Sequence, residues 1–164
     1  MKKAFLAALF LAGALPVGEG VLSAQGSSGP NITDADIQLL RQDLQSKKKQ
    51  LVAANMPLTD SEAQKFWPVY DQYAADTTKL NNYRLSLVKE YAENYNSMTD
   101  DQAQSLLTRW TGADESVVAL RLKYIPIFQK VLPAKKVVRF FQIDRRITMM
   151  LELQFASAVP LAKP

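Results

Sequence analysis

The amino-acid sequence predicts an all-α fold of four helices, in which a long bent antiparallel hairpin is flanked by two further helices in an elongated molecule. A nine-residue pattern typical of a helix start occurs at 32–40, 58–66 and 98–106, and a degenerate copy occurs at 132–140. Apolar residues after each copy recur at helical spacings of three and four. The sequence beyond residue 31 contains no segment that alternates as a strand does.

Each regular copy of the pattern contains Thr-Asp followed by an acid or an amide. Thr33, Thr59 and Thr99 stand at the N-cap position, where a side-chain oxygen accepts a hydrogen bond from a free backbone N–H. Glu62 and Gln102 follow Thr59 and Thr99 by three residues, which completes a capping box. These five residues are therefore predicted to cap helices.

The N-terminal 24 residues are predicted to be a cleavable signal peptide. Lys2 and Lys3 precede an apolar run at 4–15, and Pro16 and small residues follow it. The run is shorter than the roughly 20 residues of a membrane-spanning helix, although an uncleaved membrane anchor is the alternative. We therefore expect a periplasmic protein, with a flexible linker at 25–31 and a single helical domain at 32–160.

The first helix is predicted at 34–54 and ends before Pro57, because the residue before a proline avoids the helical region. Within it, the lysines at 47–49 are interpreted as a solvated face. The second helix is predicted at 59–95, the third begins at residue 99, and the fourth covers about 133–158. The short connection around Ser97 makes the second and third helices an antiparallel hairpin.

Two prolines lie inside the hairpin, Pro68 and Pro126, each 29 residues from Ser97. An interior proline removes one backbone hydrogen bond and usually kinks a helix. Because the two prolines are equally far from the turn, both kinks are expected at one level. The hairpin is therefore predicted to bend as a unit.

The composition excludes several kinds of chemistry. The chain has no cysteine and no histidine, so it lacks the usual ligands of zinc and copper and the common nucleophiles and bases. It also contains neither a phosphate-binding loop nor a dinucleotide fingerprint. We predict a non-enzymatic protein with no catalytic residues, no metal and no cofactor. Export argues against nucleic acid as a partner, despite a pI near 9.3.

Basic residues concentrate in the last helix. From Pro133 onward the net charge is +4, which exceeds the +3 left for the whole chain after removal of the signal peptide. This charge has two interpretations, a binding surface for an acidic partner or client, and a solvated face that balances acids elsewhere. The candidate partner-binding cations are Lys135, Lys136, Arg139, Arg145 and Arg146.

Aromatic residues are dense at the start of the second helix. Trp67 and Tyr70 are candidates for a client-binding surface beside the arginines. The alternative is that most of these rings form the core or a dimer seam.

The export signal, the helical character, the lack of cysteine and the segments 58–62 (Leu-Thr-Asp-Ser-Glu) and 98–102 (Met-Thr-Asp-Asp-Gln) resemble the LTxxQ-motif proteins of the Spy/CpxP type. Glu62 replaces the Gln of that motif and Met98 replaces its Leu. The resemblance covers roughly 33–147 and implies a periplasmic stress protein, folded as a bent hairpin that forms a homodimer. Some relatives are labelled heavy-metal sensors, which the lack of His and Cys argues against here.

The resemblance also implies two functions. One is an ATP-independent chaperone that binds unfolded or acidic proteins. The other is a dedicated regulatory binder of a membrane sensor protein. A purely structural envelope protein is a third alternative.

Overall fold

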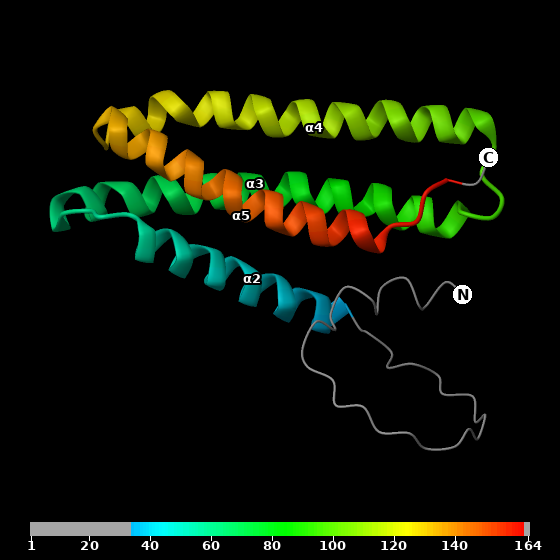
Figure 1. Ribbon diagram of the computed structural model, residues 1–164, viewed down its shortest axis with the longest axis horizontal. Helices are drawn as coiled ribbons and strands as arrows, with labels where there is room; N and C mark the ends of the chain where they lie inside the picture. The colour runs from blue at the N-terminus through cyan, green and yellow to red at the C-terminus, as the bar shows by residue number, and fades with distance from the viewer. Residues whose placement is uncertain (1–33, 163–164) are drawn as a thin grey trace, which may run out of the picture.

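The computed structural model describes residues 34–162, which form four helices and no strand (Figure 1). They are α2 (Asp34–Asn55), α3 (Asp60–Asn94), α4 (Asp100–Gln129) and α5 (Ala134–Ala158). The predicted all-α, four-helix architecture is confirmed, with helix ends close to those predicted. The predicted signal peptide, the linker and Thr33 lie outside the described residues. Within 34–162, no helix has the length and apolar character that crossing a membrane requires.

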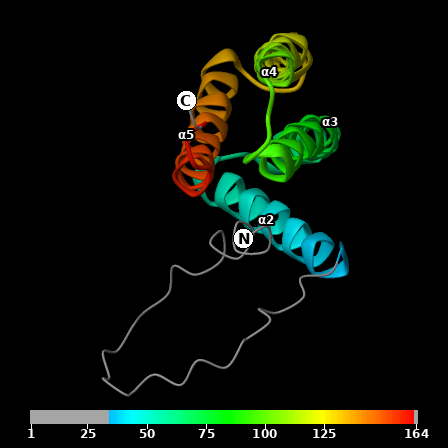
Figure 2. The same ribbon diagram turned by 90° about the vertical axis from the view of Figure 1, so that its right-hand side faces the viewer.

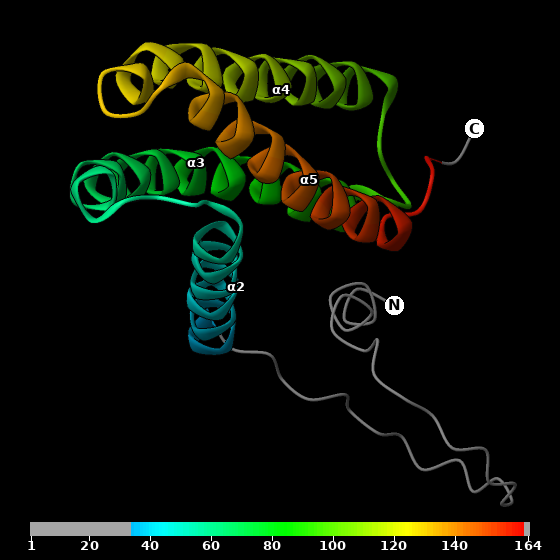
Figure 3. The same ribbon diagram turned by 60° about the vertical axis from the view of Figure 1, so that its left-hand side comes forward.

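The helices α3 and α4 form the antiparallel hairpin and share the most extensive interhelical packing (Figure 1). After a short turn at residues 130–133, α5 runs back across the hairpin. Viewed end-on, α2 and α4 lie on opposite sides of the pair formed by α3 and α5 (Figure 2). Figure 3 shows that α2 leaves the other helices at a steep angle.

Pro68 and Pro126 lie within α3 and α4, and both helices continue through them. The two prolines sit at one level of the hairpin, because the rings of Phe66 and Phe128 beside them pack 5.6 Å apart. This agrees with their equal distance from the turn in the sequence. The joint bend of the hairpin remains a prediction.

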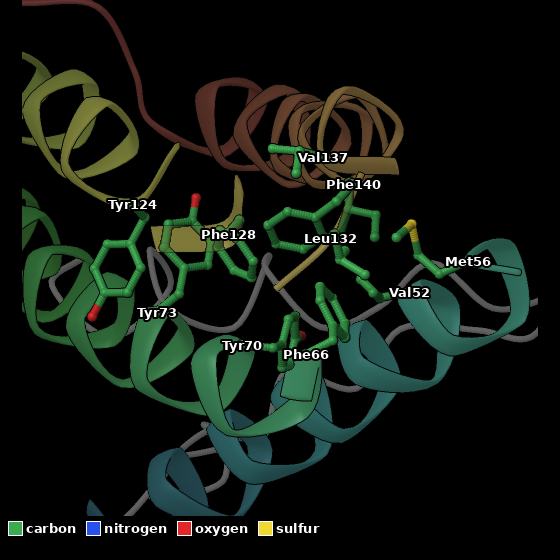
Figure 4. Packing of buried hydrophobic residues seen from close by; sticks show 11 residues of the cluster. Val52, Met56, Phe66, Tyr70, Tyr73, Tyr124, Phe128, Leu132, Val137 and Phe140 are labelled. Atoms are coloured by element: carbon green, nitrogen blue, oxygen red, sulfur yellow. The ribbon is translucent and has the colours of Figure 1, made fainter. Parts of the chain in front are cut away.

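The main core lies where all four helices meet and is dominated by aromatic rings (Figure 4). Phe140 of α5 is at its centre, 0% exposed. Its ring lies between 4.6 and 6.0 Å from five others, with which it forms edge-on and tilted pairs. The buried members of this core are Val52, Met56, Phe66, Tyr70, Tyr73, Tyr124, Phe128, Leu132, Val137, Phe140 and Ile147.

A smaller core, built on Leu87, Tyr91, Leu106 and Ala113, packs the hairpin nearer its turn. Ion pairs border it on the surface. Arg109 of α4 forms a two-pronged contact with Glu90 of α3. Arg84 of α3 pairs with Asp114 of α4 and Glu152 of α5, 3.2 and 3.0 Å away. Arg84 therefore links α3, α4 and α5.

Candidate protein-binding surface

The first turns of α3 and α4 are both closed by capping boxes. The backbone N–H of Glu62 donates to the Thr59 hydroxyl, and the Glu62 carboxylate accepts from the Thr59 N–H. Thr99 and Gln102 form the same reciprocal pair. These four side chains satisfy backbone donors that a helix start leaves free, so they build the hairpin.

Lys136 of α5 contacts this capping machinery. Its ammonium group donates to the Glu62 oxygen that also accepts from the Thr59 N–H. The hydrogen bond from Lys136 is the main cause that holds the pKa of Glu62 below its ordinary value, and the Thr59 N–H adds to it. A cation in a first turn opposes the helix dipole, and the contact with Glu62 explains why one is accepted there. Lys136 is therefore a structural residue.

Arg139 has a structural contact as well. Its Nε donates to the backbone oxygen of Asn55, 2.7 Å away, at the last residue of α2. The final carbonyls of a helix lack partners within the helix, so Arg139 satisfies one of them from a neighbouring element. Two of the five candidate cations thus hold the start of α5 in place. Lys136 joins it to the start of α3, and Arg139 joins it to the end of α2.

The two aromatic candidates belong to the main core. Tyr70 is 2% exposed, so its ring is not on a surface that a client can reach. Trp67 is half-buried against the same cluster, and the ammonium group of Lys49 lies 5.3 Å from its ring. Lys49 also pairs with Asp71 at 2.6 Å. Tyr70 therefore lies in the core, and Trp67 packs against it.

A buried polar centre, which the sequence did not suggest, surrounds Asp144 of α5. This residue is 1% exposed, yet its carboxylate meets a polar group from each of the other three helices. Lys48 of α2 pairs with it at 2.6 Å, the Tyr73 hydroxyl of α3 donates to it at 2.9 Å, and Arg121 of α4 lies 3.9 Å away. The interpretation of residues 47–49 as a solvated face is thus wrong for Lys48.

One signal in the sequence could have indicated this centre. Asp144 falls between Phe140 and Ile147 on the apolar face of its helix, at the spacing of buried positions. A buried carboxylate needs a charged or hydrogen-bonding partner, so an acid in an apolar stripe predicts a cation on a facing helix.

The remaining candidates, Lys135, Arg145 and Arg146, are exposed on the side of α5 that faces away from the core. Four apolar side chains lie among these cations at helical spacing. The side chains of Val138, Met149, Met150 and Leu153 are 54% to 73% exposed. Among the residues whose side chains the structure describes, none forms an ion pair with these three cations. We define the α5 outer face as Lys135, Val138, Arg145, Arg146, Met149, Met150 and Leu153.

The chemistry of the α5 outer face suits the binding of protein chains. Guanidinium groups bind carboxylates through paired hydrogen bonds, and methionine side chains adapt to apolar surfaces of varied shape. The exposed acid Glu152 of α5 is already engaged by Arg84. Among the described residues no cluster of acids could hold a metal ion. The α5 outer face therefore has side chains suited to bind carboxylates and apolar groups of another protein chain.

The contacts of the ionisable side chains make the stability of the fold depend on pH. Hydrogen bonds from Lys136, Tyr124 and Arg109 lower the pKa of Glu62, Asp76 and Glu90, respectively. Burial is the main cause that raises the pKa of Tyr73, and it raises that of Tyr124 to about 12. The depressed carboxylate pKa values stabilise the fold above the ordinary values of 4.5 and 3.8, and this stabilisation is lost in acid. The raised tyrosine values stabilise it below pH 10, and this is lost as the pH rises further.

We therefore expect the free energy of unfolding to be nearly constant between about pH 5 and pH 9.5 and to fall on both sides. Urea unfolding followed by circular dichroism at pH 3, 7 and 11 measures this. An unfolding free energy at pH 3 equal to that at pH 7 would contradict the carboxylate contacts. An unfolding free energy at pH 11 equal to that at pH 7 would contradict the burial of the tyrosines.

No known protein family, curated protein or solved structure matches this chain. The fold and the surface thus define it only as an all-α protein with an exposed basic and apolar helix face. The resemblance to the LTxxQ-motif family remains a prediction from the two short motifs.

Proposed function

We propose that this protein is an exported, non-enzymatic binding protein that holds partly unfolded or acidic protein chains on the α5 outer face, in the manner of an ATP-independent chaperone. One observation carries the proposal. Arg145 and Arg146, without ion-pair partners in the described chain, lie directly beside the exposed Met149, Met150 and Leu153. The predicted signal peptide supports the periplasm as the place where this occurs.

Unfolded chains present both of the features that such a face would bind. They expose apolar side chains that a folded protein buries, and acidic ones carry a surplus of carboxylates. Contiguous exposed apolar residues beside charged groups are typical of interaction sites. The arginines would attract the client at long range, and the methionines and leucine would hold it after contact.

The support beneath this face favours the same function. The opposite side of α5 places Phe140, Asp144 and Ile147 in the core, and Lys136 and Arg139 fix the first turns. A face held rigidly in advance loses little conformational entropy when a partner binds. The helix can therefore present its cations and thioethers without first becoming ordered.

The test is the light scattering of α-lactalbumin, whose disulfides are reduced with dithiothreitol so that it unfolds and aggregates. The reductant leaves this chain unchanged because it has no cysteine. We expect the protein to suppress the scattering without ATP. The double variant Arg145→Glu/Arg146→Glu should need about tenfold more protein for the same effect, because both attractions become repulsions.

A matched control is the double variant Lys89→Glu/Lys130→Glu, which changes the net charge equally at exposed positions outside α5, on α3 and in the turn after α4. It should suppress aggregation nearly as well as the unchanged protein. No suppression by the unchanged protein would refute the proposed function. An equal loss in the control would show that net charge, and not the α5 outer face, is responsible.

A further inference from the structure

A second exposed apolar stripe lies on α4. We define the α4 outer face as Leu107, Thr111, Asp114, Glu115, Val118 and Leu122, all of them exposed. Its three large apolar side chains are 54% to 68% exposed, and no helix covers them. Thr111, Asp114, Glu115, Val118 and Leu122, together with Ala119, line a shallow hollow on this face. Asp114 pairs with Arg84, whereas Glu115 has no ion-pair partner among the side chains that the structure describes.

The α4 outer face and the α5 outer face carry the same pattern with opposite charge. Five of the six positions of the α4 outer face correspond to the position 31 residues later in the α5 outer face, and the sixth, Thr111, corresponds to the exposed polar residue Gln142. Apolar residues coincide with apolar residues and acids coincide with arginines. The pairs are Leu107 with Val138, Asp114 with Arg145, Glu115 with Arg146, Val118 with Met149, and Leu122 with Leu153.

This correspondence cannot be used within one molecule. It needs the two helices to lie parallel, whereas α4 and α5 run in opposite directions across the turn that joins them (Figure 1). Both faces are also exposed, so they do not touch each other in the folded chain. Two molecules, in contrast, can bring α4 of one alongside α5 of the other in the parallel sense.

We propose that the α4 outer face of one molecule packs in parallel against the α5 outer face of a second copy. Apolar layers at both ends of the stripe then enclose a central band in which Asp114 and Glu115 meet Arg145 and Arg146. The stripe is about 22 Å long at 1.5 Å per residue, which is enough for a helix-on-helix contact. Charge complementarity fixes the register, because a shift by four residues, about one turn, sets the acids against Phe141 and Gln142 or against Met149 and Met150.

The contact covers the face that we propose for clients, so self-association and client binding compete. Only this competition rests on the proposed function, because the contact itself follows from the two matched faces. The acidic and apolar α4 outer face then has the same chemistry as an acidic unfolded chain. A client that displaces the α4 outer face frees the α5 outer face. Client binding therefore converts the self-associated protein into the client-bound protein.

Sedimentation equilibrium of the purified protein tests the contact. We expect concentration-dependent self-association that weakens with salt. Glu115→Arg and Arg145→Glu should each raise the dissociation constant about tenfold, because each sets like charges against one another. The double variant Glu115→Arg/Arg145→Glu should recover most of the loss, because these two residues lie on facing flanks of the parallel helices and the pair is restored with its signs exchanged. Glu93→Arg, an exposed acid on α3, is the control and should change nothing.

Several results would overturn this inference. They are a monomeric protein at all concentrations, single variants that associate as well as the unchanged protein, or a double variant weaker than either single variant. Circular dichroism of each variant shows whether it is folded. Glu115→Arg leaves the α5 outer face intact, so it should suppress aggregation at least as well as the unchanged protein. A monomer that suppresses aggregation refutes only the contact, and an oligomer that does not suppress it refutes only the proposed function.

Discussion

Replacing Asp144 by asparagine should lower the free energy of unfolding by about 3–5 kcal/mol, the usual cost of removing one partner of a buried ion pair. The amide keeps the shape of the side chain and can still accept from Tyr73. It leaves the ammonium group of Lys48 without its counter-charge, 2.6 Å away, and removes the charge that Arg121 faces. Urea unfolding at pH 7 measures the loss.

The matched control for this prediction is Asp71→Asn, which removes an acid from the exposed pair with Lys49. Exposed pairs are screened by water, so this variant should be far closer to the unchanged protein. A double-mutant cycle between Asp144→Asn and Lys48→Met isolates the coupling of the two residues. A loss for Asp144→Asn no larger than that of the control would show that the carboxylate does not join the helices.

The second large effect is expected at Phe140, where substitution by alanine should cost about 3–5 kcal/mol of unfolding free energy. The ring packs against Phe66, Tyr73 and Phe128 from two other helices. Its removal leaves a cavity that rigid aromatic neighbours fill poorly. Thermal and urea unfolding of the variant measure the loss of stability.

Val138→Ala is the control for Phe140→Ala, since Val138 lies on the same helix but on the exposed side. Exposed substitutions of this kind usually change stability by about 0.5 kcal/mol or less. Comparable losses for the two variants would contradict the placement of α5, because they would mean that both of its faces are buried alike.

Local chemistry explains why the helices could be predicted from the sequence. Thr59 and Thr99 cap through residues three positions away, so each helix start is written in a few consecutive residues. Pro133 marks the start of α5 in the same local way, without a side-chain cap. The equal spacing of Pro68 and Pro126 from the turn placed them at one level, because an antiparallel hairpin pairs residues by their distance from its turn.

The candidate site could be predicted only in part, because the roles of its cations depend on contacts between distant parts of the chain. Lys136 meets Glu62 and Arg139 meets the end of α2, and nothing in the local sequence separates them from Arg145 and Arg146. The same applies to Lys48, whose partner Asp144 comes from the last helix. Only the packing of α5 divides its basic residues into an inner set and an exposed set.

The packing also gives a physical reason for the irregular fourth copy of the helix-start pattern. Where the other copies have acids, this copy has Lys135 and Lys136. Lys136 pairs with Glu62, the residue that completes the capping box of the second copy. The departure from the pattern is therefore explained by a contact between two of its copies, and the exposed cations further along α5 carry the proposed function.

The central claim, that clients bind the α5 outer face, is tested most directly by nuclear magnetic resonance of the methionine methyl groups. Met149 and Met150 lie on this face, whereas Met56 is buried in the main core and Met98 is half-buried near the hairpin turn. The protein is labelled with ¹³C at these methyl groups and titrated with reduced, carboxymethylated α-lactalbumin, which stays unfolded. We predict that the signals of Met149 and Met150 shift or broaden while that of Met56 is unchanged. Binding that leaves the signals of Met149 and Met150 unchanged would contradict the claim.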